Sequence, residues 1–283
     1  MLEHSPKVSE NMQKCYFSFS KNLIKFFGNT KLSLFSTKMI SRYKVSRYNE
    51  GAKPSTINRE LSMLSKSFNL AVNEWEWLEE NVVSKVPKEK ENKRDRWLSL
   101  DEEKSVLTVC PDWLSEIVLF ALNTGLRKDE LLSLEWYRVS LVRKTIIILD
   151  TKSGEPKTIP LNKVAFNLLN SKFSKKILRI NGLVFVSRVG TKINPDNLRR
   201  AFNSALNKVS IENFTFHDLR HTFATRLAQS GIDIYKISKL LGHKDIRMTQ
   251  RYSHHCTESL RDGVNILDDY YNPTTIQEIS SLN

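Results

Sequence analysis

Cysteine is scarce in this chain of 283 residues, and its three copies, Cys15, Cys110 and Cys256, lie far apart. An odd number of widely separated thiols without a Cys-x-x-Cys pair argues against a disulfide framework and against structural zinc. The sequence also lacks any apolar run approaching the ~20 residues that a membrane-spanning helix requires. Its first residues, MLEHSPKVSENMQK, contain no apolar signal-peptide core. These absences predict a protein of a reducing compartment, the cytoplasm.

Positive charge, by contrast, is abundant. The chain carries 44 Lys and Arg against 31 Asp and Glu, which gives a formal net charge of +13. Residues 1–96 contribute +7 and the remaining residues +6, so the excess is not confined to a basic tail. This distribution favours a polyanionic partner, such as a nucleic acid held in a groove that is lined from two sides. A merely basic soluble protein is the plainer alternative.

The length and the hydrophobic content of 40% predict about two domains with packed cores. In the first part of the chain, helical periodicity covers 10–28, and an apolar stripe runs along 55–77. Between them, Ser36 or Thr37 is placed to cap a helix that extends through Tyr48. These signals predict a helical N-terminal domain.

A charged stretch separates this part from the rest, because no apolar residue follows Val86 until after residue 96. Such a composition predicts an exposed linker. The predicted organisation is a helical domain over 1–84, a basic linker over 85–96, a second domain over 97–256, and a C-terminal helix and tail over 257–283.

The second domain combines helical signals with one clear β-hairpin. The run TIIIL at 145–149 is rich in β-branched residues, and the turn Lys152-Ser-Gly-Glu-Pro leads back into Lys157-Thr-Ile-Pro. Other predicted elements are a helix that starts at Ser99, helices over 113–123, 161–172 and 195–208, and a short buried strand over 183–186. The predicted fold class is therefore mainly α with a small β-sheet.

The stretch HDLRHTFATRLAQSGIDIYKISKLLGHKDIRMTQRY, residues 217–252, carries the most chemistry. His217 and Arg220 are three residues apart, so a helix places them on one face. His243 follows the Gly242 turn, and Tyr252 comes nine residues later. A nucleophile, cations for a phosphate and a proton carrier together predict phosphoryl transfer.

The two histidines of His-Asp-Leu-Arg-His, at 217 and 221, also have a spacing that can bind a metal. The zinc hydrolase motif requires Glu after the first histidine, whereas this chain has Asp218, and Arg220 would crowd a cation. We therefore predict no metal ligands, and a buried hydrogen-bonding role for His221.

This pattern resembles the tyrosine recombinase (phage integrase) family. The matching residues are His-Asp-Leu-Arg-His at 217–221, Leu-Leu-Gly-His at 240–243 and Tyr252. The string TGLRKDELLSLEW at 124–136 resembles the segment with the family's first catalytic arginine, which Arg127 matches, and Glu130 matches its acidic companion.

The hairpin string TKSGEPKTIPL also resembles the family's, and Lys152 matches the catalytic lysine there; Lys157 is the rival. The catalytic set that the resemblance implies is Arg127, Lys152, His217, Arg220, His243 and Tyr252, with Glu130 holding or orienting the site.

The resemblance implies a site-specific recombinase of DNA that works through a covalent 3′-phosphotyrosine without metal or nucleotide cofactors. Its implied fold is a helical core-binding (SAM-like) domain followed by a mixed α+β catalytic domain. The implied partners are double-stranded DNA, three further copies in a homotetramer on two sites, and accessory DNA-bending or directionality proteins. Integration or excision of a mobile element is the expected role. An Xer-like resolvase of replicon multimers, a type IB-like topoisomerase and a non-enzymatic DNA-binding regulator are the alternatives.

Residues 54–72 resemble the last helices of the family's core-binding domain, whose polar face follows the DNA backbone. Small departures from the family pattern are Asn81-Val82 in place of Asn-Pro, and Tyr137 and Arg138 where acidic residues are common. The predicted DNA-binding residues are Lys38, Arg42, Lys44, Arg47, Arg59, Arg199 and Arg200, for which a solvated basic face is the plainer alternative.

The tail after Tyr252 carries Leu260, Val264 and Leu267 at helical spacing. An apolar stripe of this kind must dock, either on its own catalytic domain or, as the resemblance suggests, on a neighbouring protomer.

Overall fold

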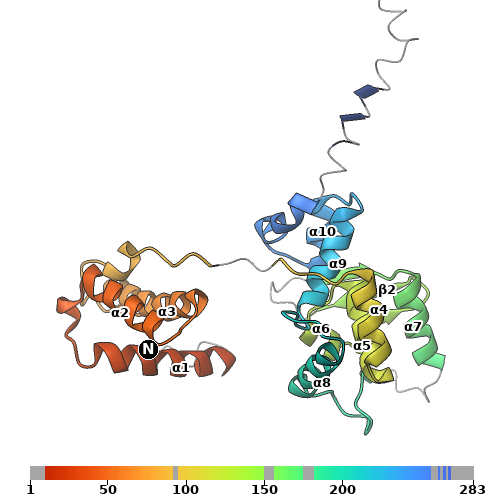
Figure 1. Cartoon of the computed structure of the whole chain (residues 1–283), viewed down its shortest axis with the longest axis horizontal. Coiled ribbons are helices and arrows are strands. Elements are labelled where there is room, and N and C mark those ends of the chain that lie inside the picture. The colour runs from red at the N-terminus through yellow and green to blue at the C-terminus, as the bar shows by residue number, and fades with distance from the viewer. Residues whose placement is uncertain are drawn as a thin grey trace, which may run out of the picture. The chain divides into compact units, whose positions relative to one another are not determined.

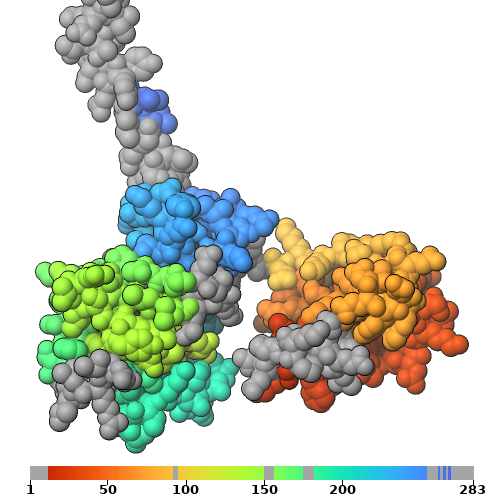
Figure 2. Space-filling view, turned by 180° about the vertical axis from the view of Figure 1, so that it is seen from behind, coloured from red at the N-terminus to blue at the C-terminus, as the bar shows by residue number. Residues whose placement is uncertain are grey.

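The computed structural model describes residues 10–91, 95–149, 156–174 and 182–255, together with residues 261, 264, 265, 267 and 268. The chain divides into two compact units, Met1–Arg94 and Asp95–Asn283 (Figure 1). Figure 2 shows them as space-filling bodies, coloured from red in the first unit to blue at the end of the second. The described residues are mostly helical with one small sheet, so the predicted fold class is confirmed. No helix among the described residues is long and apolar enough to cross a membrane.

In the described part of the first unit there are three helices, α1 (Glu10–Phe27), α2 (Thr37–Asn49) and α3 (Pro54–Asn73), with short 3-10 turns η2 (Leu32–Leu34) and η3 (Val82–Lys85). Ser36 caps α2, because its hydroxyl accepts a hydrogen bond from the backbone N–H of Met39. The core is the predicted stripe of α3, with Ile57, Leu61 and Phe68, packed against the inner faces of α1 and α2.

The first unit extends beyond the predicted boundary at residue 84. Val86 is buried in its core, and the Asn58 side chain pairs with the Glu89 backbone through an Nδ2–O distance of 2.9 Å and an N–Oδ1 distance of 2.8 Å. Lys44 forms an ion pair with Glu89. Residues 85–91 therefore belong to the first unit, because Val86 is buried and Glu89 and Glu91 find partners on α2 and α3, although most of these residues are exposed.

The second unit begins with α4 (Leu100–Val109) and α5 (Asp112–Thr124), and Ser99 forms a capping box with Glu102 at the start of α4. A short α6 (Lys128–Leu132) and η4 (Trp136–Arg138) lead into the sheet. Further helices of this unit are α7 (Lys163–Ser174), α8 (Pro195–Lys208), α9 (Asp218–Gln229), α10 (Ile234–Leu241), η5 (Ile246–Met248) and η6 (Gln250–His255).

The sheet has three antiparallel strands in the order β1 (Val139–Ser140), β2 (Thr145–Ile148) and β3 (Lys157–Pro160). The register pairs Thr145 with Pro160 and Ile148 with Lys157, as expected for the predicted hairpin. One face of the sheet packs into the core through Ile146, Ile148 and Ile159. The predicted strand over 183–186 forms isolated bridges to Glu135 and Lys192 instead of joining this sheet.

Candidate active site

The predicted first arginine lies at the start of α6, where it is tied to Glu130. The buried Glu130 carboxylate accepts the Arg127 backbone N–H at 3.0 Å and its guanidinium Nη1 at 2.8 Å. The first bond satisfies a donor that the helix start leaves free, and the second fixes the direction of the guanidinium. Glu130 therefore fixes the direction of the Arg127 side chain.

Lys157 at the start of β3 reaches the same carboxylate. Its Nζ lies 2.8 Å from Glu130 Oε2 and 3.3 Å from the Leu241 carbonyl oxygen, with 8% of the side chain exposed. Burial lowers the pKa of Lys157 to about 8, although Glu130 acts in the opposite direction. For Glu130, burial would raise the pKa, and the contacts with Lys157 and Arg127 outweigh it and lower the pKa.

Arg220 on α9 is 3% exposed, and backbone carbonyls hold its guanidinium. Nη1 donates to Gly125 O at 2.8 Å, and Nη2 donates to Leu241 O at 2.6 Å. Gly125 ends α5 with φ of +62°, and a Cβ there would meet the Phe223 ring at 2.4 Å. Burial, followed by the charge of Arg127, lowers the pKa of Arg220 to about 10.

Gly242 ends α10 in the left-handed conformation, with φ of +64°. A Cβ at this position would lie 2.7 Å from Cδ of Lys157, so the glycine makes room for the lysine stem. The next residue, His243, is held by its Nδ1, which lies 2.8 Å from Oγ1 of the buried Thr249. Burial and the charges of Arg220 and Arg127 lower the pKa of His243 to about 4. Its ring is therefore neutral near pH 7.

Tyr252 on η6 is 2% exposed and packs against Ala224, Ala228 and other apolar residues of α9 and α10. Its hydroxyl is hydrogen-bonded to Nδ1 of His221. Burial raises the pKa of Tyr252, while Arg251 and Arg220 act to lower it. His221, predicted as a buried hydrogen-bonding residue, is half-buried and contacts the predicted nucleophile itself.

His217 directly precedes α9 and is exposed. Its ring packs edge-on against that of His221, with centroids 5.1 Å apart. Partial burial of the ring, followed by the charge of Arg220, lowers the pKa of His217. Asp218 beside it accepts the backbone N–H of Thr215 at 2.7 Å and its hydroxyl at 2.8 Å, which fixes the turn that leads into α9.

A hollow of about 530 Å³ opens beside these residues. Arg127 and His217 line it together with Arg199, Asn203 and Thr215. Of the two predicted DNA-binding residues on α8, Arg199 thus borders the hollow. Arg200 bonds Asn197 through Nη2 at 2.6 Å and is not among the lining residues.

The predicted DNA-binding residues of the first unit fall into two groups. Lys38, Arg42 and Arg59 are exposed. Arg47 instead lies against the fully buried Glu60 carboxylate, with Nε and Nη2 each at 3.0 Å, and it also pairs with Glu50. Lys44 forms its ion pair with Glu89 and donates to Pro87 O at 2.9 Å. Both of these side chains stabilise the first unit, and this use competes with binding to DNA.

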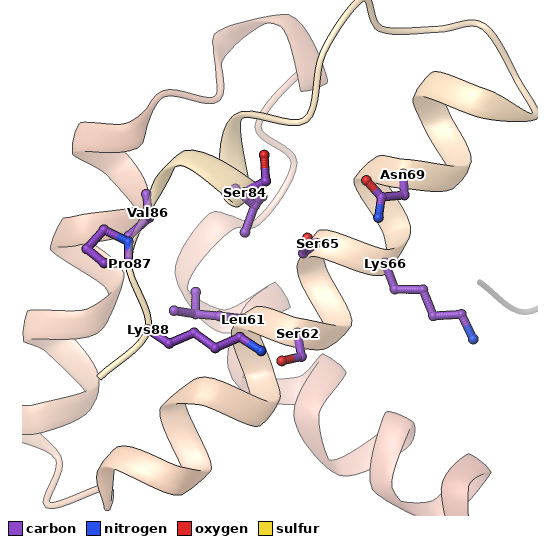
Figure 3. A pocket seen from close by; sticks show the side chains of 10 residues that line it. Leu61, Ser62, Ser65, Lys66, Asn69, Ser84, Val86, Pro87 and Lys88 are labelled. Atoms are coloured by element: carbon purple, nitrogen blue, oxygen red, sulfur yellow. The ribbon is translucent and has the colours of Figure 1, made fainter. Parts of the chain in front are cut away.

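The first unit also has a hollow of about 420 Å³ between α3 and residues 83–88 (Figure 3). Hydroxyl and amide groups line it at Ser62, Ser65 and Asn69 of α3, and Lys88 extends toward α3 from the opposite side. Hydroxyl, amide and ammonium groups such as these are the ones that proteins use to bind the phosphate oxygens of DNA.

Arg127, Glu130, Arg220, His243 and Tyr252 gather in one region of the second unit, and the Leu241 carbonyl accepts from both Arg220 and Lys157. Lys152, the predicted lysine, lies outside the described residues, as does Leu260 of the tail; Val264 and Leu267 are exposed. Among the described residues, no group of three or more His, Cys, Asp or Glu could hold a metal ion.

Sequence reasoning missed the place of Lys157 and the hydroxyl partner of His243. The sequence indicated Lys157 only as the rival hairpin lysine. Its position two residues before the apolar Ile159 places both side chains on the same face of the strand, and this was the available signal for its burial. Thr249 had no signal apart from its position six residues after His243.

Comparison with known proteins identifies the family of the chain. The phage integrase N-terminal domain matches residues 9–90, and the phage integrase family matches residues 96–259. The integrase of Salmonella phage P22 is 34% identical over 228 residues, covering 74% of this chain and 57% of that protein. This chain therefore spans little more than half the length of that relative.

Two further proteins resemble the chain over more of their length. The XerC-like tyrosine recombinase of Caldanaerobacter subterraneus subsp. tengcongensis is 28% identical, covering 95% of this chain and 80% of that protein. The lambda integrase dimer bound to a COC′ core site has a TM-score of 0.72 at 25% identity, covering 87% of this chain and 72% of that one. The matched ranges lie in both units and include every described residue of the site, and the chain belongs to the phage integrase family.

Proposed function

We propose that this protein is a site-specific DNA recombinase that cleaves and rejoins strands through a covalent 3′-phosphotyrosine on Tyr252. One observation supports the proposal most: Arg127, Arg220 and His243 lie close together, near the buried Tyr252, whose hydroxyl is hydrogen-bonded. Integration or excision of a mobile element is the role that we infer, since the P22 relative is a phage integrase.

The two arginines bind the scissile phosphate. Attack on a phosphodiester places negative charge on the non-bridging oxygens, and planar guanidinium groups suit these oxygens. Arg127 and Arg220 are each held by partners inside the protein, so little reorganisation accompanies the reaction. His243, whose Nδ1 is engaged by Thr249, has its other ring nitrogen for the phosphate.

The nucleophile requires help, because a tyrosine of ordinary pKa is ionised in only about one molecule per thousand at pH 7. Burial raises the pKa of Tyr252 further, and the arginines counteract this effect. The departing 5′ oxygen needs a proton, which we assign to Lys152, while His217 serves as a further acid or base. The phosphotyrosine conserves the bond energy until a 5′ hydroxyl attacks it.

Duplex DNA is the proposed substrate, and the lambda integrase structure bound to a core site supports this choice. On the first unit, we assign backbone contacts to Lys38, Arg42 and Arg59. We infer a homotetramer on two sites, with the tail passed to a neighbouring protomer and with accessory DNA-bending proteins. The cytoplasm is the proposed location, and neither metal nor nucleotide takes part.

An Xer-like resolvase is the second candidate, and the XerC-like relative favours it because the match extends over 95% of this chain. A relaxing topoisomerase would use the same residues. It would act as a monomer on plasmid without preference for a site.

A nicked duplex that carries the recombination site tests the proposal. The site sequence comes from the DNA that flanks the gene. Wild-type protein should become trapped as a covalent adduct, and Tyr252→Phe should bind the duplex but form none, because only the attacking oxygen is missing. A covalent band from the Phe variant would contradict the assignment of the nucleophile.

A further inference from the structure

His221 is the imidazole that contacts the hydroxyl of Tyr252, although the resemblance assigns acid–base chemistry to His217. Nδ1 of His221 and the tyrosine hydroxyl form a hydrogen bond between α9 and η6, across 31 positions of sequence. The two rings are tilted at 48° with centroids 5.9 Å apart. The oxygen that would attack the phosphate is thus hydrogen-bonded to the ring nitrogen of His221 in the protein without DNA.

The other two histidines of the site are engaged differently. His243 uses its Nδ1 for the hydroxyl of Thr249. The rings of His217 and His221 pack in a T-shaped arrangement, with their planes at 89°. A division of roles follows from these contacts, with His221 serving the nucleophile.

We propose that His221 is a further catalytic residue, the general base that takes the proton of Tyr252 during strand cleavage and returns it during rejoining. The inference rests on the proposed function. As the bond from Oη to phosphorus forms, the Oη–H bond breaks and its proton moves to Nδ1. The bond from phosphorus to the 5′ oxygen breaks, and that oxygen leaves with its electron pair and a proton from the general acid. In rejoining, tyrosinate departs and recovers its proton from the imidazolium.

The surroundings keep this base neutral until it is needed. Burial, followed by the charge of Arg251 and the proximity of His217, lowers the pKa of His221 to about 4, with Asp218 opposing and Arg220 adding to the effect. A neutral ring whose hydrogen is on Nε2 leaves the Nδ1 lone pair for the tyrosine O–H. A bound phosphate offsets the positive charge of Arg220, so DNA binding raises the basicity of His221 when the substrate is in place.

The burial of Tyr252 gives a second reason for a local base. Only 2% of the residue is exposed, so bulk water has little access to its hydroxyl. A proton that leaves this oxygen needs an acceptor within the protein, and Nδ1 of His221 is within hydrogen-bond reach.

Two changes separate proton transfer from positioning. His221→Asn keeps an acceptor near the Nδ1 position but cannot take a proton at working pH. Replacement of Tyr252 by a fluorinated tyrosine lowers the pKa of the nucleophile and reduces the need for a base. Adduct formation is measured in a single turnover on the nicked duplex, with His243→Asn as the matched control at another histidine of the site.

We expect His221→Asn to slow adduct formation by about 100-fold, the usual worth of a positioned base, with duplex binding unchanged within a few-fold. Fluorinated Tyr252 should recover about 10-fold or more of that loss in His221→Asn and little in His243→Asn, because only the first variant lacks the base.

Three results would overturn the inference while leaving the recombinase proposal intact. One is a His221→Asn rate close to wild type, and another is a faster rate, which would mean that the contact holds the tyrosine in reserve. The third is a loss that fluorinated tyrosine does not relieve, which would mean positioning alone. Wild-type protein that forms no adduct would instead refute the proposed function, and this inference with it.

Discussion

Lys157 joins two elements that carry the site, and removing its charge should destabilise the second unit. The side chains of Lys157 and Glu130 are 8% and 5% exposed, and their charged atoms lie 2.8 Å apart. Lys157→Met leaves a buried carboxylate with only Arg127 as a charged partner. We expect a loss of about 3 kcal/mol in the free energy of unfolding, the lower end for a broken buried pair, because Arg127 still holds Glu130.

A double variant tests whether the loss comes from the stranded charge. Lys157→Met combined with Glu130→Gln removes both charges while an amide oxygen still accepts the Arg127 backbone N–H. The double variant should therefore be more stable than Lys157→Met, with a coupling energy of about 1–3 kcal/mol. Lys208→Met, at an exposed lysine of α8, is the matched control and should change stability by no more than about 0.5 kcal/mol.

The assay is urea unfolding read by hydrogen exchange in peptides from α6 and α10, because the chain has two units and a signal from the whole protein mixes them. A loss below about 1 kcal/mol in Lys157→Met, the level of an exposed ion pair, would refute the reasoning. Equal losses in the single and double variants would refute it as well, since the carboxylate would then not need its ammonium partner.

Gly242→Ala should cost more stability than Gly190→Ala, measured by the same exchange assay. Both glycines have positive φ, which destabilises a residue with a side chain by about 1–2 kcal/mol, but of the two only Gly242 would bring a Cβ against Lys157. Equal losses of stability would show that the lysine side chain moves aside. The free energy of unfolding should also fall as pH drops from about 6.5 to about 4. His221 and His243 have pKa values of about 4 in the folded protein, so in this pH range they bind protons in the unfolded chain but not in the folded one. His221→Asn combined with His243→Asn should flatten this slope in urea midpoints taken at several pH values, and an unchanged slope would place its origin elsewhere.

Much of the fold is predictable from the sequence because its signals are local. The stripe of α3, the capping box at Ser99 and the β-branched run of β2 each depend on neighbours within a few positions. The motif strings, through the family resemblance, pointed to Arg127, Arg220, His243 and Tyr252 as catalytic groups, and this assignment stays a prediction.

Partners that lie on different elements were not predictable in this way. Charge composition predicted a linker after residue 84, but Asn58 binds the Glu89 backbone 31 positions away. Arg47 looked like a solvent-facing base on α2, yet packing places it on the buried Glu60 of α3. A buried carboxylate requires a cation, and the choice of cation depends on which helix faces it.

The sequence by itself determined most of the helices and the hairpin, because these follow from periodicity and spacing along the chain. It also carries the motifs from which the family resemblance assigns the predicted catalytic groups. Only the tertiary structure decided that Lys157 joins Glu130 to the Leu241 carbonyl, and that His221 rather than His217 contacts the Tyr252 hydroxyl. These contacts join residues 27 to 84 positions apart. Their distances depend on how β3, α9, α10 and η6 pack, and side-chain packing between elements has no period in the sequence.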